Sequence, residues 1–386
     1  MQIYLDYSST TPPRPEVVTY INQVCTQGWG NPSSTHQWGK KASMILERAR
    51  IQIANSIKAN DIESIIFTSG GTEANNLAIL GTAKQHKRRQ HIIISSVEHS
   101  SINKPIKFLE THGWEITRLP VDYQGKVNPF DLKAAIRKNT VLISIIYGQS
   151  EVGTLQPIKE LSEIAKSYGI LFHTDAAQAI GKLAINVQDL NIDLLSFSAH
   201  KIYGTQGIGA LYIRPGSIVS PLFHGGGQEK GIRSGTQSLA TIAGFGLATE
   251  LICREMIEES NRLMQLRNQL FKYMSDYPYL IVSGDKKYRL PHHASFIFSN
   301  LSKNQKLKKI TGQTIVRHMN LAGIGISAGS ACHSGKLIPS PVLLAMGYSA
   351  SDAVSGIRLT LGKNTSKDDI TWTAIVLKQI LSRLLS

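Results

Sequence analysis

The sequence contains little cysteine: only Cys25, Cys253 and Cys332 occur among its 386 residues. These positions are far apart and odd in number, which argues against a framework of disulfide bonds. No two of them have the short spacing that is typical of a metal site. Such sparing use of cysteine is typical of a reducing compartment, in which thiols stay free.

Long hydrophobic runs are also missing. No apolar stretch approaches the roughly 20 residues that a helix needs to cross a bilayer, so we expect no contact with a membrane. The first residues, Met1–Asp6, do not combine a basic region with a following apolar core, and they therefore lack the pattern of a signal peptide. Internal repeats and low-complexity segments are absent as well. We expect a cytoplasmic protein.

Acidic residues are scarce relative to basic ones: 27 Asp and Glu against 42 Lys and Arg give a formal net charge of +15. This excess fits an ordinary soluble surface, an acidic partner protein or a nucleic acid. The two basic clusters, Lys84–Arg89 and Lys303–Lys309, contain no aromatic residues that could stack on bases. We therefore expect no direct binding of nucleic acid.

The sequence is rich in short apolar runs that alternate with amphipathic stretches from residue 60 onward. Apolar residues make up 42% of the chain, enough to build one large domain and a smaller one. The alternation predicts a mostly parallel sheet that helices cover on both faces. The predicted strands are Ser64–Thr68, His91–Ser95, Val141–Tyr147, Ile170–His173, Leu194–Ser198 and Ile208–Ile213, and the predicted helices include Glu73–Lys84, Pro129–Lys138 and Pro157–Tyr168.

After the predicted strands comes a long amphipathic segment, Glu250–Ser275, whose apolar residues recur at helical spacing. We interpret it as one helix that bridges two domains. A strand-like stretch, a helix and a Gly- and Ser-rich segment follow it. The predicted division is a large domain over residues 15–261 and a small α+β domain formed by residues 1–14 and 262–386, with a mobile cysteine loop at about 322–338.

Polar residues follow several of the predicted strands directly. In open parallel sheets, ligands bind beyond the carboxyl ends of the strands, so we expect these groups to converge in space. The glycine-rich turn "SGGTEANN" leads into a helix, whose first N–H groups suit a phosphate, although a plain helix cap explains the turn equally well. The turn is not a nucleotide P-loop, because the Gly-Lys-Ser/Thr ending is missing. The converging residues are Gly71 and Thr72, His99, Asp175 and Gln178, and His200 and Lys201.

The position of Lys201 needs an explanation, because its ammonium group lies at the end of an apolar strand. Taken alone, Lys201 could be an ordinary lysine whose aliphatic stem is buried and whose ammonium group reaches water. Asp175, taken alone, could be an ordinary helix cap. In a cleft of low dielectric constant, however, a lysine becomes a nucleophilic amine. A lysine, a carboxylate and a phosphate cradle together form the set that pyridoxal 5'-phosphate requires.

Eight segments of the sequence resemble one known family: "YLDYSSTT", "GNPSSTH", "FTSGGTEANNLAI", "VEHSS", "FHTDAAQAIGK", "SFSAHKIYGTQGIGALYIR", "HGGGQEKGIRSGT" and "SAGSACHSG". They are similar, in the same order, to the cysteine desulfurases, which form part of the class V branch of aminotransferase-like pyridoxal phosphate enzymes. The cysteine segment resembles that of the iron–sulfur assembly group. The resemblance runs from about Ile3 to Gly362 and implies a homodimer with the aspartate aminotransferase-like fold, which has a seven-stranded, mostly parallel sheet in the large domain.

The resemblance also implies a role for each site residue. Lys201 would bind the cofactor covalently, and His99 would stack over the pyridine ring and move protons. Asp175 would pair with the ring nitrogen, and Gln178 with the phenolic oxygen. The remaining assignments are Gly71, Thr72, Ser198 and His200 for the phosphate, Thr236 for the phosphate of the partner subunit, Ser150 for the cofactor, and Arg358 and Asn31 for the substrate.

Cys332 is implied to be the sulfur acceptor. A free cysteine is usually a small buried hydrophobic residue, and we keep that reading for Cys25 and Cys253. The segment "ISAGSACHSGK" around Cys332 is instead small, polar and suited to a mobile loop. The implied reaction converts L-cysteine to L-alanine and leaves a persulfide on Cys332. The sulfur would then pass to an acceptor protein, such as a U-type iron–sulfur scaffold, for cluster assembly or thiolation.

The sequence departs from the family pattern at Gln149 and Ser150, where the family usually has two asparagines. Serine is shorter than asparagine and lacks the amide, so the contact of residue 150 with cofactor and substrate is expected to differ. Two other readings of the chain stay open. One is a related class V enzyme, either a selenocysteine lyase or an aminotransferase of small amino acids, and the other is a basic binding module without catalysis.

Overall fold

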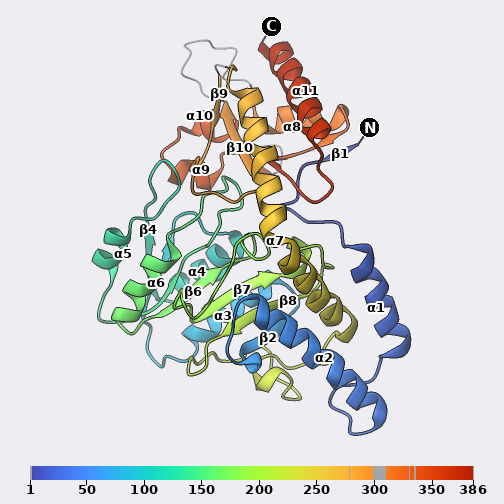
Figure 1. Ribbon diagram of the computed structural model, residues 1–386. Helices are drawn as coiled ribbons and strands as arrows, with labels where there is room; N and C mark the ends of the chain where they lie inside the picture. The colour runs from blue at the N-terminus through green and yellow to red at the C-terminus, as the bar shows by residue number, and fades with distance from the viewer. Residues whose placement is uncertain (1, 278, 299–309, 330, 334–335, 386) are drawn as a thin grey trace.

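The computed structural model describes residues 2–277, 279–298, 310–329, 331–333 and 336–385, and for residues 331–333 and 336 it describes the backbone alone. The chain forms a larger body around one sheet and a smaller body around another, and helix α7 extends from one into the other (Figure 1). Both ends of the chain lie beside the smaller body.

The larger body contains a seven-stranded sheet in the order β2-β8-β7-β6-β5-β3-β4. Strand β8 is antiparallel to both of its neighbours, and all other neighbouring strands are parallel. The expected mostly parallel seven-stranded sheet is therefore confirmed. Its strands are β2 (Ile65–Thr68), β3 (His91–Ser95), β4 (Glu115–Leu119), β5 (Thr140–Ser144), β6 (Leu171–Asp175), β7 (Leu194–Ser198) and β8 (Gly209–Ile213).

Strand β4 is the one that the sequence pattern did not reveal. It lies at the edge of the sheet, and of its residues "EITRL" only Leu119 is buried. A search for apolar runs misses such a strand because half of its surface faces water. The run predicted over Val141–Tyr147 is also shorter as a strand: it ends at Ser144, although Ile145 and Tyr147 still donate backbone hydrogen bonds to His173 and Asp175 of β6.

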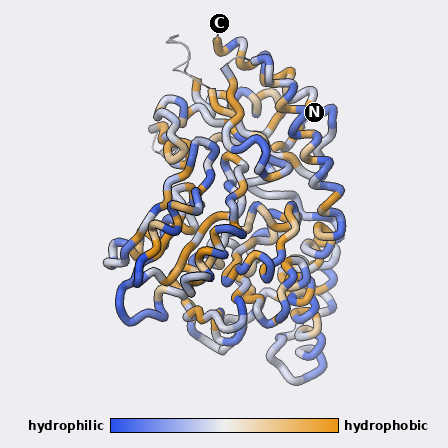
Figure 2. Tube along the Cα trace, turned by 60° about the vertical axis from the view of Figure 1, so that its left-hand side comes forward, coloured by the Kyte–Doolittle hydropathy of each residue, from blue (hydrophilic) through white to orange (hydrophobic). Residues whose placement is uncertain are grey.

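Helices cover both faces of the sheet, as the sequence predicted. Successive strand residues alternate between the two faces: Ile93 packs in the apolar cluster with α2 and α7, whereas Ile92 and Ile94 pack in the cluster with α3 and α4. The strands are consequently apolar on both sides, and they form the hydrophobic centre of the larger body in Figure 2. The covering helices are α1 (Pro15–Gln27), α2 (Gln37–Ser56), α3 (Gly71–Ala83), α4 (Ser100–Thr111), α5 (Pro129–Ala135) and α6 (Ile158–Ser167).

Helix α7 (Leu239–Met274) begins well before the helix predicted at Glu250. Its first part is apolar on all sides and buried, so it lacks the contrast between faces that marks an amphipathic helix. Gly244 and Gly246 let it approach its neighbours closely, because a Cβ at Gly246 would lie 2.7 Å from Ala49 of α2. Neither α7 nor another helix in the described part of the chain combines the length and apolarity that crossing a bilayer would require.

The smaller body is built on an antiparallel sheet in the order β12-β15-β10-β9, and the short strand β1 pairs in parallel with β11. Its strands are β1 (Ile3–Tyr4), β9 (Leu280–Val282), β10 (His293–Phe298), β11 (Ile324–Gly325), β12 (Ser327–Ala328), β13 (Ala331–His333), β14 (Lys336–Ile338) and β15 (Ile357–Thr360). Its helices are α8 (Gly312–Leu321), α9 (Pro341–Ala345), α10 (Ala350–Ala353) and α11 (Lys367–Leu385).

Separate apolar clusters fill the two bodies. The cluster of the smaller body includes Ile3 and Leu5 and takes up α7 from Leu263 onward, whereas the largest cluster of the other body reaches along α7 to Ile252. We propose that these clusters are the cores of two domains, with the division near residue 261. A domain is expected to have its own hydrophobic core.

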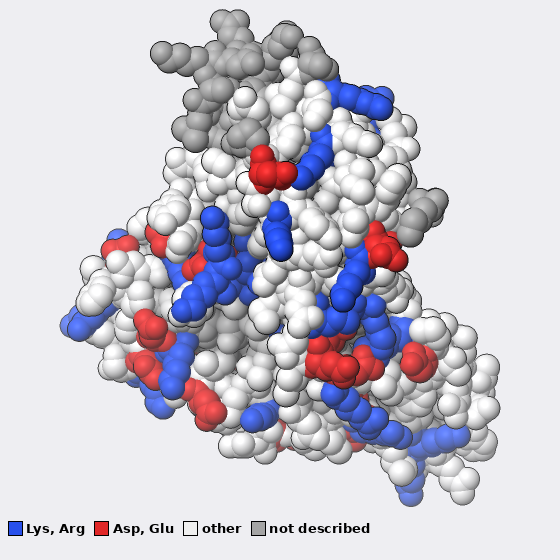
Figure 3. Space-filling model, turned by 45° about the horizontal axis from the view of Figure 1, so that its top comes forward, with Lys and Arg blue, Asp and Glu red and all other residues white. Residues whose placement is uncertain are grey.

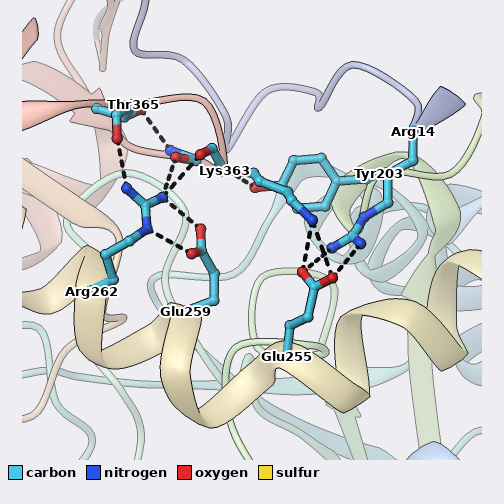
Figure 4. A network of polar contacts seen from close by, with 8 residues as sticks. Arg14, Tyr203, Glu255, Glu259, Arg262, Lys363 and Thr365 are labelled. Carbon is cyan, nitrogen blue, oxygen red and sulfur yellow. Dashed lines mark hydrogen bonds and ion pairs between the residues drawn. The ribbon is translucent and has the colours of Figure 1, made fainter.

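A polar network on α7 ties the two bodies together (Figure 4). Glu255 accepts two hydrogen bonds from Arg14, at 2.9 and 2.8 Å, and is also paired with Lys363 at 2.9 Å. Two turns further on, Arg262 donates to carbonyl oxygens of residues 362, 363 and 365 at 2.7–3.1 Å. The end of β15 is thereby fixed against α7, and β15 carries Arg358.

Charged side chains of both signs share the surface. On the face shown in Figure 3, Lys and Arg side chains lie close to Asp and Glu side chains at several places. Ion pairs such as Arg137–Glu115 and Arg118–Glu110 account for part of this mixing. Exposed pairs of this kind contribute little to stability, but they neutralise the excess positive charge locally.

Candidate active site

A cavity of about 380 Å³ lies at the carboxyl edge of the seven-stranded sheet. Asp175 from the end of β6 and Ser198 from the end of β7 line it, as expected for an open parallel sheet. Arg358 reaches it from β15 of the smaller body. The predicted residues that line the cavity are Gly71, Thr72, His99, Ser150, Asp175, Gln178, Ser198, His200, Lys201 and Arg358.

Lys201 stands on the short helical turn η2 (Ala199–Lys201) directly after β7. Its Nζ donates to the carbonyl oxygens of Ser8 and Ser9, at 2.6 Å each. Burial, together with the positive charge of Arg358, lowers the pKa of the Lys201 amine to about 8. The amine therefore loses its proton close to neutral pH, which a nucleophile requires.

A chain of hydrogen bonds connects Asp175 to His99. Asn75 Nδ2 donates to Asp175 Oδ2 at 2.8 Å and to Ser101 Oγ at 2.7 Å. Ser101 Oγ lies 2.8 Å from His99 Nδ1, and that nitrogen also accepts from the Ser101 N–H at 3.2 Å. Because Nδ1 is an acceptor, the ring proton of a neutral His99 lies on Nε2.

Asn75 and Ser101 were missed by the sequence reasoning. Asn75 lies within α3 and Ser101 within α4, where a polar residue usually faces water, yet both side chains are buried. The available signal was a polar residue on a helix face that is otherwise apolar, since Ala74 and Leu77 beside Asn75 are buried as well. Buried polar groups need partners, and these two find them in the cavity wall.

The first turn of α3 forms an anion cradle. Gly70 is the N-cap residue, makes no side-chain cap hydrogen bond, and has a φ of +154° that favours glycine. Gly71 and Thr72 follow and line the cavity together with Ser198 and His200, so the N-terminus of the helix lies at the cavity. Burial, together with the charge of Lys201, lowers the pKa of His200 to about 4 and keeps its ring neutral. The positive end of the helix dipole completes a site for an anion.

Arg358 is held at the cavity by three residues from two segments, the N-terminal segment and the turn that carries Ser150. Its Nη1 donates to the carbonyl oxygen of Ser150 at 3.0 Å, and its Nη2 to Asp6 Oδ1 at 2.7 Å and to Ser9 Oγ at 2.8 Å. The side chain is 14% exposed. Asp6 and Ser9 were not predicted as site residues, because the N-terminal segment carries no strand signal that would place it beside the sheet.

The turn that carries Ser150 explains the role of Gln149. The Gln149 side chain accepts from the backbone N–H groups of Glu151 and Val152 and donates to the carbonyl oxygen of Val97 at 3.2 Å. Gln149 is buried and does not line the cavity, whereas Ser150 does. The Gln149 side chain therefore stabilises this turn. The serine at position 150, which is shorter than the asparagine of the family pattern, is the residue that alters the cavity wall.

The remaining predicted residues do not line this cavity. Asn31 is exposed, and its side chain accepts from the Ser33 N–H in a turn before α2. Thr236 is exposed beside a separate hollow that includes Glu229 and Arg233. The backbone of Cys332 lies in β13 opposite Leu337, and its side chain is outside what the structure describes.

The other two cysteines differ from each other. Cys253 packs against the large apolar cluster, as predicted for a small hydrophobic residue. The same prediction is wrong for Cys25, which is exposed. Helix α1 buries only Val17 and Val24, and this narrow contact leaves Cys25 on the solvent side of the helix.

Known proteins resemble the chain in sequence. The class-V aminotransferase family model matches residues 3–372. The cysteine desulfurase IscS of Dictyoglomus turgidum is 46% identical and aligns over 99% of this chain and 95% of its own. The cysteine desulfurase IscS of Methanosarcina thermophila is 43% identical over 99% of this chain and 92% of its own.

Solved structures resemble the chain as well. One described as a NifS-like protein superposes with a TM-score of 0.91 at 32% identity, covering 99% of this chain and 100% of that chain. Another, SspA in complex with cysteine, has a TM-score of 0.81 at 35% identity and covers 94% of this chain and 99% of that chain. These matches confirm the expected fold. The chain belongs to the class-V aminotransferase family and, within it, to the cysteine desulfurases.

Proposed function

We propose that this protein uses pyridoxal 5'-phosphate to convert L-cysteine to L-alanine and transfers the released sulfur to Cys332 as a persulfide. One observation carries the residue-level proposal: Lys201, Asp175, the α3 N-terminus and Arg358 all line one cavity. The amine matches the aldehyde of the cofactor, the carboxylate matches its ring nitrogen, and the anion cradle matches its phosphate. The guanidinium matches the carboxylate of an amino acid substrate.

The polar atoms of the cavity support this assignment. Asp175 Oδ1 and Oδ2 are fixed by the N–H of Ala177 at 2.9 Å and by Asn75, so the carboxylate is held in place for a ring nitrogen. Gln178 Nε2 donates to the carbonyl oxygen of Ser8 at 2.9 Å, whereas Gln178 Oε1 is buried and has no hydrogen-bond partner among the described residues, which leaves this oxygen available to a donor group of a ligand. The N–H groups of Gly71 and Thr72 suit a phosphate.

When bound, pyridoxal phosphate supplies an electron sink for the bond to Cα of an amino acid. Lys201 would bind the aldehyde carbon and give way to the amine of cysteine. His99 would stack on the ring and exchange protons through Nε2. Arg358 would hold the substrate carboxylate with its guanidinium, exchanging the contact with Asp6 for one with the ligand.

The electrons of the sulfur transfer balance without an external oxidant. The Cys332 thiolate attacks the sulfur of the substrate, an S–S bond forms, and the Cβ–S bond breaks. The electron pair of that bond stays on Cβ, which takes up a proton to give the methyl group of alanine. The thiolate is the reactive species, so a cation near its path, such as Arg358, favours the reaction. Mass spectrometry tests the proposal: incubation with L-cysteine should add one sulfur atom to the peptide that contains Cys332 and release alanine.

The protein is further proposed to be a cytoplasmic homodimer that delivers sulfur to an acidic acceptor such as a U-type scaffold. Its positive net charge supports an acidic partner. Thr236 supports the dimer, because it is exposed and away from the cavity of its own chain. Its loop is nevertheless well fixed: buried Glu229 pairs with Arg50 of α2 at 2.9 Å.

The Thr236→Ala variant tests whether Thr236 acts in the partner subunit. We expect it to weaken cofactor affinity about tenfold, because one hydrogen bond to a charged group is lost. Heterodimers of a Thr236→Ala chain and a Lys201→Ala chain keep Lys201 in one site only, and if Thr236 acts in the partner subunit this site should bind the cofactor with wild-type affinity. If Thr236 instead served its own chain, the same site should show the tenfold weaker cofactor affinity of the Thr236→Ala homodimer.

Ser150→Asn tests the departure from the family pattern. The longer amide should reach the ligand, so we expect KM for cysteine to fall about two- to tenfold, the effect of one added hydrogen bond. Ser150→Ala is the matched control: it keeps the backbone carbonyl that Arg358 binds, and KM should change little. An unchanged KM in Ser150→Asn would argue against a direct role of this position.

A further inference from the structure

A buried histidine of the smaller body, His293, contacts the wall of the candidate active site. It is the first residue of β10, and its Nε2 lies 3.1 Å from the carbonyl oxygen of Ser150, which belongs to the larger body. A carbonyl oxygen only accepts hydrogen bonds, so Nε2 is the donor. Burial, together with the positive charges of Arg289 and Arg358, lowers the pKa of His293 well below its ordinary value. The ring is therefore neutral, and it uses its single N–H for this contact.

The Ser150 carbonyl oxygen accepts a second hydrogen bond, from Arg358 Nη1 at 3.0 Å. These two donors use both lone pairs of the oxygen. The register of the antiparallel sheet explains how they reach one atom. Ser295, two residues after His293, is paired with Arg358 of β15. Residues two apart in a strand share a face of the sheet, as do residues directly opposite in neighbouring strands, so His293 and Arg358 lie on the same face.

Close packing fixes the orientation of the His293 ring. Gly153 has a φ of +80°, and a Cβ at this position would lie 2.7 Å from both Cγ and Nδ1 of His293, so glycine lets the turn approach the ring this closely. A backbone hydrogen bond continues the contact, since the Leu290 N–H donates to the Gly153 carbonyl oxygen at 2.8 Å. The turn and the ring are thus held together, with Nε2 directed at Ser150.

The bond from Arg358 to Ser150 is the contact of this guanidinium that a bound substrate need not displace. The bond from Nη2 to Asp6 joins a cation to an anion, and a substrate carboxylate would compete for it. Arg358 Nε is buried and has no hydrogen-bond partner among the described residues, so it is a free donor for the same ligand. The orientation of Arg358 during binding therefore depends on how firmly the Ser150 carbonyl is held.

We propose that His293 is a positioning residue for Arg358: it holds the Ser150 carbonyl oxygen in place, and that oxygen orients the guanidinium in the cavity. The inference rests on the proposed role of Arg358 in binding the substrate carboxylate. A neutral donor suits this task, because it fixes the oxygen without placing a second cation where it would compete with Arg358 for the carboxylate.

The first measurement requires no turnover: phenylglyoxal modifies arginine side chains, and peptide mass spectrometry gives the rate at Arg358. His293→Phe keeps an aromatic ring and removes the donor. It should raise the rate about fivefold, the factor that corresponds to one hydrogen bond between neutral groups. Arg254, whose side chain is 68% exposed, is the internal standard and should react at an unchanged rate. KM for cysteine should rise by a similar factor with little change in kcat, as expected when uniform binding is lost.

Two further comparisons isolate the hydrogen bond. His293→Gln places an amide N–H near the position of Nε2 and should restore wild-type values. His293→Asn is one methylene shorter, does not reach Ser150, and should behave like His293→Phe. His91→Phe is the matched control: His91 is also buried, and its ring nitrogens lie 2.8 Å from the hydroxyls of Thr117 and Thr140, but it does not line the cavity. This control should leave KM and the Arg358 rate unchanged.

Wild-type Arg358 rates in His293→Phe and His293→Asn would overturn the proposal, as would an equal increase in His91→Phe. If His293→Phe does not fold, the Asn and Gln variants still decide, because equal rates in these two would also refute a role of the hydrogen bond. Failure of the proposed function has a different signature. If Arg358→Ala kept the wild-type KM while the modification rates changed as expected, His293 would still position Arg358, and the substrate-binding role of Arg358 would fall.

Discussion

Lys201→Ala should reduce alanine formation from cysteine to the level of a reaction without enzyme. The variant removes the amine that the structure presents at the end of β7, held by the carbonyl oxygens of Ser8 and Ser9. No other lysine lines the cavity in the described part of the chain. Lys182 is close, but its Nζ donates to the backbone of Lys201 and it does not line the cavity.

The measurement combines activity with cofactor chemistry. Borohydride reduction of the wild-type protein with pyridoxal phosphate, followed by peptide mapping, should place the label on Lys201, and the variant should carry none. Lys84→Ala is a suitable control, because Lys84 is exposed and donates only to the Pro221 carbonyl oxygen. A label at another lysine, or full alanine formation by the variant, would refute the assignment of Lys201.

Cys332→Ala should abolish persulfide formation and sulfur delivery while leaving cofactor binding intact. The wild-type visible spectrum and its change on adding cysteine should therefore persist in the variant, whereas alanine release should fall to background. This pattern separates the two reactive residues, because Lys201→Ala is expected to lose the spectrum itself. The physical reason is that Cys332, in the proposed transfer, would act on the substrate sulfur and would take no part in holding the cofactor.

The other cysteines provide the controls for this variant. Cys25→Ser changes an exposed residue and Cys253→Ser a partly buried one, and neither lines the cavity, so both should retain wild-type turnover. An aminotransferase has no need of Cys332. Unchanged sulfide and alanine formation by Cys332→Ala would therefore contradict the proposed transfer step.

The sequence predicted the residues at the strand ends because two signals coincide there. Asp175 and Lys201 each stand where an apolar run stops, and a parallel sheet brings such positions to one edge. By contrast, Asp6 comes from a polar segment, Asn75 from within α3 and Ser101 from the first turn of α4. Their burial depends on contacts with residues that are distant in the sequence, and no local pattern reveals such contacts.

The fold shows the same difference between elements that a local sequence pattern reveals and elements that it does not reveal. Strands with two buried faces were predicted within a few residues, whereas the edge strand β4 was missed because it has only one buried face. The first part of α7 was missed for the opposite reason, since it is buried on all sides and shows no periodic contrast. Exposed Cys25 shows that residue type alone does not determine burial on a helix that buries only two of its side chains fully.

The pairing of Asp6 with Arg358 joins residues 352 positions apart. During synthesis on the ribosome, the Asp6 carboxylate must therefore wait until 352 further residues have been added before its guanidinium partner emerges. Contacts of such long range form late and slowly. A nascent chain that already contains Lys201 and the glycine-rich turn consequently lacks the proposed substrate clamp until Arg358 has been synthesised.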